Sequence, residues 1–192
     1  MKILFIDNFD SFVYNLVDEF EKMNCEVLVY RNDVNIKIID DVITKFKPDL
    51  IVISSGPSTP KEAGNSIQII KEYSKEIPIF GVGLGHQCII EAFEGTVGRA
   101  PEIFHGKPSK IKHDNLTIFK GVENPFQAGR YHSLTAIEVP YSFEISARSE
   151  RGIVMAVRHK EFFVEGIQFH PESILTPVGG LIIENLIKEV KT

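Results

Sequence analysis

The chain contains no tryptophan, and only two cysteines and three methionines occur among its 192 residues. Cys25 and Cys88 cannot provide a disulfide framework or metal-ligand spacing, which favours a reducing, cytoplasmic environment. No apolar run approaches the roughly 20 residues that a membrane span requires, and the first residues lack the pattern of a signal peptide. These absences argue against a disulfide-rich secreted protein and against a membrane protein.

Positive charge is also scarce. Lysine and arginine number 21 against 26 aspartates and glutamates, for a formal net charge of −5. Without a basic block to neutralise phosphates, the chain is not expected to bind nucleic acid. The shares of hydrophobic residues (43%) and charged residues (24%) are typical of a soluble globular protein. We expect residues 1–192 to form one domain, because no linker is long enough to divide the chain.

What the first half does have is an alternation of short apolar runs and helical patterns. Strands are predicted at 3–6, 27–30, 50–53 and 78–82, and helices at 12–20, 36–46 and 66–73, with Asp10 or Ser11 as the first N-cap. This rhythm predicts an α/β fold with a doubly wound, mostly parallel sheet and flanking helices. Ligands bind at the carboxyl ends of such strands, so the loops that follow them are candidate site segments.

After Gly95 the pattern of apolar and polar residues changes. Short alternating segments at 102–105, 109–112, 144–147, 153–157 and 162–169 predict a smaller antiparallel or mixed β portion. The apolar positions between 181 and 187 predict an amphipathic helix near the end.

Three alternating glycines join the fourth predicted strand to a helix predicted at 86–94. Gly81, Gly83 and Gly85 follow an apolar run, which is the pattern of a nucleophile elbow, a sharp turn that lifts one side chain into a cleft. A dinucleotide-binding loop would need its third glycine at position 86, where the chain has histidine. The apex of the elbow falls on Gly83, which carries no side chain. A glycine turn that only permits close packing is the alternative interpretation.

A candidate general base lies much later in the chain. His170 and Glu172 flank a proline, so both side chains can point to one side of a strand end. A cysteine or serine nucleophile needs an imidazole base, and that base needs a carboxylate to orient it. Backbone N–H groups at Gly56 and Leu84 could stabilise an oxyanion. Each feature alone is weak evidence, because isolated His-x-Glu pairs are usually solvated and Ser, Pro and Gly dominate ordinary turns.

Six ordered segments together carry a more specific signal. They read IDNFDSFVYNL at 6–16, YRND at 30–33, GVGLGHQ at 81–87, HGK at 105–107, RYHSL at 130–134 and GIQFHPESILT at 166–176. These segments resemble the class I (triad) glutamine amidotransferases. The resemblance is to the subunit (component II) of anthranilate synthase and aminodeoxychorismate synthase, in tryptophan and folate biosynthesis. It extends from Met1 to the terminal helix.

The resemblance implies a glutaminase subunit that hydrolyses L-glutamine through a Cys-His-Glu triad and delivers ammonia to a chorismate-binding synthase subunit. His170 is implied as general base and acid, and Glu172 as its orienting carboxylate. The residues implied to hold the glutamine, with the oxyanion hole at the N–H groups of Gly56 and Leu84, are Gly56, Pro57, Ser58, Leu84, Gln87, Ser133 and Leu134. The 7–11 loop and the 105–107 segment are implied to face the partner. No cofactor and no metal are expected on this chain.

Two positions depart from the family pattern. Gly83 stands at the nucleophile position, where the family has cysteine, and the loop at 54–58 reads SSGPS instead of SPGP followed by Gly or Cys. Cys88 cannot substitute, because five helical residues at about 1.5 Å each carry it roughly 7.5 Å beyond the apex. We expect Cys88 to pack as a small buried hydrophobe. The chain with Gly83 should be inactive in covalent catalysis, since loss of a triad nucleophile can cost on the order of a million-fold in turnover.

Three hypotheses follow from this departure. In the first, the biological protein is an active glutaminase, and Gly83 is an engineered replacement or a modified cysteine rendered as glycine. In the second, the chain is a natural pseudo-amidotransferase that serves as a glutamine-binding or structural partner subunit. In the third, it is a doubly wound nucleotide-binding module, which the missing fingerprint glycine and the lack of a Walker-type loop disfavour. The sequence does not separate the anthranilate from the aminodeoxychorismate pathway.

Overall fold

A mixed sheet of nine strands forms the centre of the computed structural model, which describes residues 1–103 and 106–192. Its parallel part consists, in spatial order, of β2 (Glu26–Arg31), β1 (Lys2–Asp7), β3 (Leu50–Ile53), β4 (Ile79–Val82) and β11 (Val164–Ile167). The sheet continues antiparallel through β10 (Val154–His159), β9 (Phe143–Ser149), β6 (Lys107–His113) and β7 (Phe126–Arg130). A separate antiparallel pair joins β5 (Thr96–Arg99) and β8 (Leu134–Glu138).

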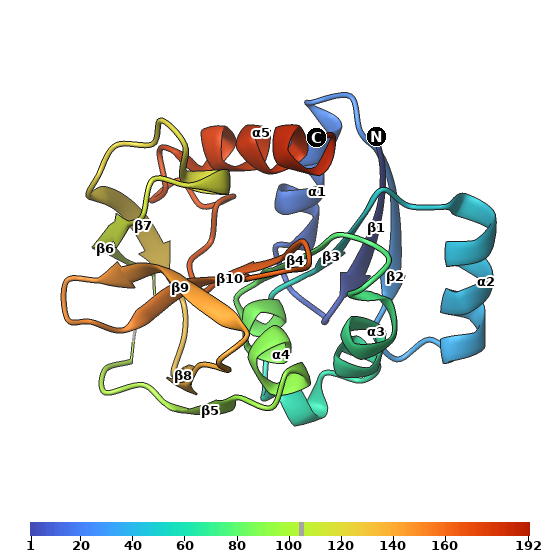
Figure 1. Ribbon diagram of the computed structural model, residues 1–192, viewed down its shortest axis with the longest axis horizontal. Coiled ribbons are helices and arrows are strands. Elements are labelled where there is room, and N and C mark those ends of the chain that lie inside the picture. The colour runs from blue at the N-terminus through green and yellow to red at the C-terminus, as the bar shows by residue number, and fades with distance from the viewer. Residues whose placement is uncertain (104–105) are drawn as a thin grey trace.

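Helices cover both faces of the parallel part (Figure 1). On one face, α1 (Val13–Glu21), α5 (Gly179–Val190) and the short η2 (Thr117–Phe119) enclose one apolar core. On the other face, α2 (Ile36–Phe46), α3 (Ser66–Tyr73), α4 (Leu84–Ala92) and the short η1 (Pro60–Glu62) enclose a second. Alternate residues of β1 enter the two cores, with Ile3 and Phe5 in the first and Leu4 and Ile6 in the second. The predicted doubly wound, mostly parallel α/β architecture is confirmed.

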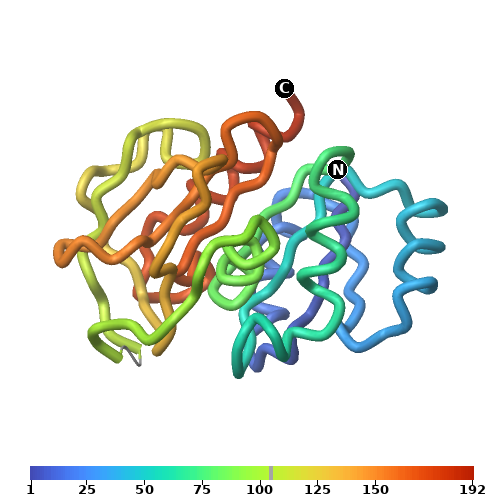
Figure 2. Tube along the Cα trace, turned by 60° about the horizontal axis from the view of Figure 1, so that its bottom comes forward, coloured from blue at the N-terminus to red at the C-terminus, as the bar shows by residue number. Residues whose placement is uncertain are grey.

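The second half of the chain extends the sheet away from the first half. Figure 2 shows the yellow-to-red strands on one side of α4 and the blue-to-green elements on the other. The connection between the halves is β11, which pairs in parallel with β4 although 81 positions separate Val82 from Phe163 in sequence order. Among the described residues, no helix combines the length and the apolar character needed to cross a bilayer.

The first-half elements follow the predicted periods closely. The helices at 36–46 and 66–73 and the strand at 50–53 have the predicted bounds. The N-cap prediction was wrong, because α1 begins at Val13 with Phe12 in the cap position and no side-chain cap bond. Asp10 instead accepts a hydrogen bond from the Phe12 N–H at 3.1 Å, within the preceding loop. Helix α4 begins at Leu84, two residues before the predicted start, because its first turn forms immediately after the glycine apex.

The second-half elements were predicted less completely. Strands β6, β9, β10 and β11 overlap the predicted segments, and α5 contains the predicted terminal helix. Residues 102–103 form no strand, and the rest of the segment predicted at 102–105 lies outside the described residues. Strands β5, β7 and β8 were missed. Their short runs include glycine and polar residues, so neighbouring strands rather than local alternation hold them in place.

Candidate active site

The elbow predicted at Gly83 is present as a sharp turn between β4 and α4. Gly83 has φ +57° and ψ −108°, a conformation that residues with side chains adopt only under strain. Its N–H donates to the Ile167 carbonyl at 2.8 Å, and its carbonyl accepts from the Gln87 N–H at 3.2 Å. The turn therefore has the strand-to-helix geometry of a nucleophile elbow, with no side chain at the apex.

The flanking glycines permit close packing around the apex. A Cβ at Gly85 would lie 2.1 Å from the Ile53 carbonyl oxygen, and a Cβ at Gly81 would lie 2.6 Å from the Gly85 backbone. Both positions thus require glycine because β3, β4 and α4 approach one another at backbone distance. The packing interpretation of these two glycines is correct alongside the elbow.

His170 and Glu172 form the expected pair in the segment after β11. The His170 Nδ1 and a Glu172 carboxylate oxygen lie 2.6 Å apart, and both side chains are largely buried. Burial disfavours the charged imidazole, but the hydrogen bond and charge of Glu172, together with the charge of Asp10, raise the pKa of His170 above its ordinary value. With Nδ1–H donating to Glu172, the Nε2 atom is left to accept a proton.

The backbone around His170 is fixed by the second half of the chain. The His170 N–H donates to the Gly129 carbonyl at 3.2 Å, which bridges this segment to the end of β7. The Thr176 hydroxyl donates to the His170 carbonyl at 2.7 Å and accepts from the Gly129 N–H at 2.9 Å. The Tyr131 ring packs edge-on against the imidazole, with ring centres 5.0 Å apart. These contacts hold the imidazole in one orientation.

The apex and the base face each other. A Cβ built on Gly83 would lie 3.4 Å from His170 Nε2, so a side chain at this position would be within reach of the base. The same Cβ would lie only 2.4 Å from the Ser55 hydroxyl oxygen, which itself is 3.5 Å from His170 Nε2. The serine hydroxyl thus lies in the space that a side chain at position 83 would enter.

The N–H groups of Gly56 and Leu84 belong to residues that line the same cavity beside the apex. Leu84 is the first residue of α4, so its N–H precedes the internal hydrogen bonds of the helix. Within residues 1–103 and 106–192, neither this group nor the Gly56 N–H donates to a protein acceptor. Gly56 must be glycine, because a Cβ there would lie 2.2 Å from the Asn8 carbonyl oxygen. That these two N–H groups form an oxyanion hole stays a prediction.

A cavity of about 220 Å³ opens beside Gly83, and we call it the inner cavity. All seven residues that the resemblance implied for glutamine line it: Gly56, Pro57, Ser58, Leu84, Gln87, Ser133 and Leu134. The Gln87 amide group donates to the Gln168 side-chain oxygen at 3.1 Å and to the Leu134 carbonyl at 3.3 Å. Gln168 also lines the cavity, and its buried Nε2 has no partner among the described residues.

Residues 132–134 form one wall of the inner cavity, and the neutral side chain of His132 stabilises this wall. Burial, together with the positive charge of Arg130, lowers the pKa of His132 to about 4. Arg130 Nε donates to His132 Nε2 at 3.0 Å, and His132 Nδ1 lies 2.8 Å from the Leu134 carbonyl oxygen. The Nδ1 proton therefore donates to the Leu134 carbonyl, so His132 supports the backbone of this wall.

A second cavity of about 620 Å³, the outer cavity, lies on the other side of Ser55 and Gly56. His170, Glu172 and Asp10 line it, so the base pair is accessible from this side. These three side chains offer ligand atoms within 4.8 Å of one another and could surround a cation. The His170–Glu172 hydrogen bond already occupies one atom of each, and the prediction for this chain remains no metal.

The remaining predictions concern the cysteines and the 105–107 segment. Cys88 is fully buried on α4, and burial raises the pKa of its thiol, so its predicted role as a small buried hydrophobe is confirmed. Cys25 is also buried and unpaired. His105 lies outside the described residues, whereas Gly106 lines the outer cavity.

Four residues at the site were not singled out as site residues from the sequence. Ser55 was noted only as a departure from a loop pattern, and Asp10 only as a candidate helix cap and as part of the 7–11 loop implied to face the partner. Gln168 and Tyr131 stood inside the segments that carry the resemblance, which was the available signal for them. Their side chains reach the site through contacts between distant segments, which local patterns do not report.

The geometry of this site agrees with the protein family and the relatives that the chain matches. Residues 4–190 match the protein family described as "Glutamine amidotransferase class-I". The chain belongs to the class I glutamine amidotransferases. It is 54% identical to "Anthranilate synthase component 2" of Methanocaldococcus jannaschii over 186 residues, covering 96% of this chain and 91% of that protein. It is 47% identical over 188 residues to "Aminodeoxychorismate/anthranilate synthase component 2" of Bacillus subtilis, covering 97% and 95% respectively.

A solved structure shares the fold of this amidotransferase. A putative GMP synthase protein from Thermoplasma acidophilum superposes with a TM-score of 0.87, covering 100% of this chain and 94% of that one. At 24% sequence identity, this likeness concerns the fold alone. The amidotransferase architecture is therefore established independently of the residue at position 83.

Proposed function

We propose that this chain is the glutamine amidotransferase subunit of a chorismate-using synthase, forming anthranilate or 4-amino-4-deoxychorismate. In this proposal it binds L-glutamine in the inner cavity and delivers ammonia to a chorismate-binding partner, component I. The names of the relatives support this assignment. The observation that carries it is the inner cavity itself, in which every residue implied for glutamine meets Gly83 beside the His170–Glu172 pair.

The proposed roles follow the positions of the groups. His170 would act as general base and then as general acid, and Glu172 would orient the imidazole and stabilise its charged form. The N–H groups of Gly56 and Leu84 would stabilise the oxyanion that forms on the glutamine carboxamide. In the family pattern a cysteine at the apex forms a glutamyl thioester. Gly83 has no sulfur, so this thioester cannot form at position 83.

A specific contact supports a second candidate, a natural subunit without the cysteine. Because the Ser55 hydroxyl lies 2.4 Å from the Cβ position of residue 83, glycine at 83 and serine at 55 fit together. A cysteine at 83 would require Ser55 to move. Such a subunit would bind glutamine or support the partner structurally, while the synthase uses free ammonia.

An apolar rim around the outer cavity is the proposed contact surface for component I. Phe12 and Ile174 line this cavity and are 63% and 95% exposed. They come from the segment after the 7–11 loop and from the loop that follows Glu172, so the rim surrounds the base pair. A partner seated there would cover the His170 side of the site and receive ammonia away from bulk water.

Calorimetric titration with L-glutamine tests the binding half of the proposal. We expect saturable binding by the purified chain, loss of binding in Gln87→Ala, and no binding of D-glutamine to either protein. Unaltered protein that fails to bind L-glutamine, alone and in complex with its synthase, would contradict the proposal. Intact mass of natural material distinguishes the two candidates, because a glycine mass at position 83 excludes an original cysteine.

Isolation of the partner tests the synthase half. We expect an affinity-tagged chain to recover a chorismate-binding subunit, and the complex supplied with chorismate and ammonia to form one of the two products. Product analysis then identifies anthranilate, 4-amino-4-deoxychorismate or both. Recovery of no chorismate-binding protein under conditions that preserve the complex would argue against this assignment.

A further inference from the structure

The Ser55 hydroxyl occupies the position of a nucleophile without belonging to the elbow. Ser55 is the second residue after β3, is 8% exposed, and its side chain lies next to Gly83. Its Oγ is 3.5 Å from His170 Nε2, a long hydrogen-bond distance of the kind that nucleophile–base pairs show before substrate binds. Ser55, His170 and Glu172 therefore form a continuous chain of hydroxyl, imidazole and carboxylate.

The neighbouring serine shows that this placement is particular to Ser55. Ser54 is fully buried; its Oγ accepts from the Asn8 N–H at 2.9 Å and donates to the Ser55 carbonyl at 2.7 Å. These bonds hold the loop and leave the Ser54 hydroxyl no access to either cavity. Ser55, in contrast, lines both the inner and the outer cavity. Its hydroxyl is thus the one at this strand end that a ligand can reach.

We propose that Ser55 Oγ serves as a relocated nucleophile, so that this chain is a Ser-His-Glu hydrolase acting on the side-chain amide of glutamine or on a γ-glutamyl ester. The choice of substrate rests on the proposed function, because the inner cavity is where the γ-glutamyl group would bind. Catalytic triads are defined by geometry and roles rather than by sequence order, so a serine in the loop after β3 can serve a base from the far end of the chain.

The backbone around Ser55 suits this chemistry. In serine hydrolases built on nucleophile elbows, the N–H of the residue after the nucleophile contributes to the oxyanion hole. Gly56 is that residue here, and Leu84 supplies a second N–H beside it, since both line the inner cavity with Ser55. The same two N–H groups therefore serve an oxygen nucleophile at position 55.

The proposed reaction is balanced with water as the second reactant. Ser55 Oγ attacks the side-chain carbonyl carbon of glutamine while its proton passes to His170 Nε2. The C–N bond then breaks, His170 gives the proton to the leaving nitrogen, and ammonia departs from a glutamyl ester on Ser55. Water gives a proton to His170 and attacks the ester, glutamate leaves, and the proton returns to Ser55. Glutamine and water thus become glutamate and ammonia.

The first test follows p-nitroaniline release from L-glutamic acid γ-(p-nitroanilide). We expect turnover above the buffer rate, and a loss of at least about 100-fold in Ser55→Ala, in line with removal of a triad nucleophile. The matched control is Ser142→Ala, a serine in the turn before β9, which should keep the full rate. Acid-quenched protein should carry one glutamyl group on the peptide containing Ser55.

A second variant separates nucleophile from packing. Ser55→Cys keeps the size and reach of the side chain, so we expect retained turnover that becomes sensitive to iodoacetamide, while the unaltered chain stays insensitive because Cys25 and Cys88 are buried. Thermal melting confirms that each variant folds. Equal rates in the unaltered chain and Ser55→Ala, with no acyl adduct, would overturn the inference and leave Ser55 as a residue that only fills space.

These experiments distinguish a failure of the proposed function from a failure of the Ser55 inference. Glutamine binding without Ser55-dependent turnover supports the proposed function and overturns this inference. p-Nitrophenyl acetate serves as a second probe that needs no γ-glutamyl recognition. If the chain hydrolyses p-nitrophenyl acetate through Ser55 but binds no glutamine, Ser55 is supported as a nucleophile and the proposed function is contradicted.

Discussion

The two sides of the site differ in how much of the expected chemistry they retain. The side built by the second half of the chain keeps a complete base pair, with His170 and Glu172 2.6 Å apart and the backbone of His170 bonded to Gly129 at the end of β7. The side built by the first half keeps the elbow backbone but has no side chain at Gly83. The backbone turn that would position a nucleophile can therefore persist without the nucleophile. Strand pairing, rather than the side chain at the apex, fixes the backbone of the turn.

The largest expected effect comes from restoring a thiol to the elbow. Relative to Ser55→Ala alone, Gly83→Cys combined with Ser55→Ala should raise glutamine hydrolysis in the partner complex by up to about 10⁵-fold, because a thiol next to His170 completes the triad. Gly83→Cys alone should gain less, since its Cβ would lie 2.4 Å from the Ser55 oxygen. Ammonia release under saturating glutamine measures both.

The control for this change is Gly152→Cys, a glycine in another turn with positive φ and open space around its Cβ. It should leave ammonia release unchanged. Double variants that bind glutamine and the partner but remain at the rate of Ser55→Ala would show that the side built by the first half has lost more than its nucleophile.

The His170–Glu172 pair from the second half of the chain should be the next most sensitive feature. In the Gly83→Cys/Ser55→Ala background, Glu172→Gln should reduce kcat by about 10²–10⁴-fold, because the imidazole loses the carboxylate that orients it. Glu172 raises the pKa of His170, so the same change should also move that pKa to lower pH. Imidazole NMR titration measures the shift. A pKa of His170 that stays in place or rises would refute this account of the pair.

A second buried carboxyl in the second half of the chain should affect the pH dependence of stability. Burial raises the pKa of Glu165 in β11 to about 7, against the opposing effects of Thr117 and Arg158. The folded state therefore holds a proton that the unfolded state has lost between about pH 4.5 and pH 7, so stability should fall as pH rises through this window. The loss should reach up to about 3 kcal/mol.

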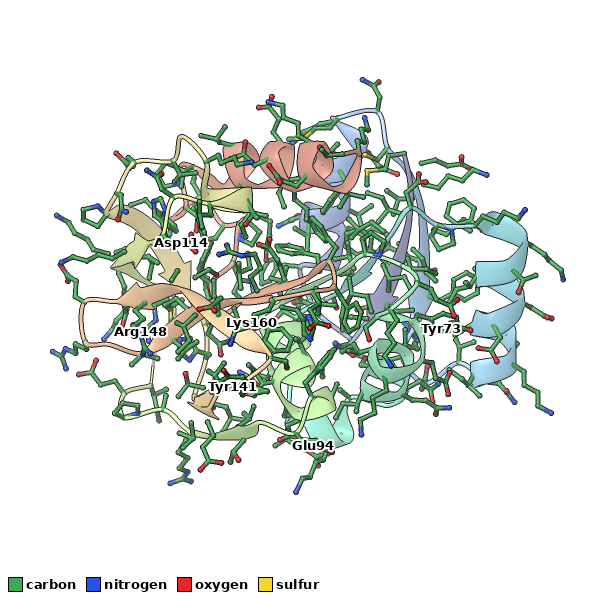
Figure 3. All side chains as sticks on the ribbon, in the orientation of Figure 1. Tyr73, Glu94, Asp114, Tyr141, Arg148 and Lys160 are labelled. Carbon is green, nitrogen blue, oxygen red and sulfur yellow. The ribbon has the colours of Figure 1, made fainter. Side chains whose placement is uncertain are left out.

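Chemical denaturation at several pH values checks this expectation. Glu165→Gln should flatten the curve, since the amide does not titrate. Asp114, which pairs with Arg158 at 2.7 Å on the exposed edge near η2 (Figure 3), provides the comparison through Asp114→Asn. That variant should keep the fall in stability. Parallel curves for Glu165→Gln and the unaltered chain would assign the pH dependence to other groups.

The smallest expected effect concerns the apolar rim. Phe12→Asp and Ile174→Asp should each weaken the complex with component I by about 10-fold, because each places a charge in a proposed apolar interface. Tyr141→Asp is the matched control: this ring is 93% exposed, lies beside Lys160 away from the outer cavity, and should leave affinity unchanged (Figure 3). Surface plasmon resonance measures all three. Weakening by Tyr141→Asp alone would relocate the interface.

The two halves also differed in how well the sequence predicted them. The strand at 50–53 and the helices at 36–46 and 66–73 were predicted to the residue, because buried parallel strands and amphipathic helices leave strong local periods. Strands β5, β7 and β8 were missed because their pairing partners, rather than their own patterns, make them strands. The seven residues that the resemblance implied for glutamine were predicted to lie together, and they line one cavity.

The sequence by itself determined the α/β plan, the family and the absence of a nucleophile at position 83. Each of these depends on residues that act locally or on ordered motifs. Only the tertiary structure decided where Ser55 lies, because its contact with His170 joins residues 115 positions apart. That contact exists because β3, β4 and β11 pair side by side and bring their carboxyl ends to one edge of the sheet. Local sequence patterns do not indicate which side chains from distant segments come into contact.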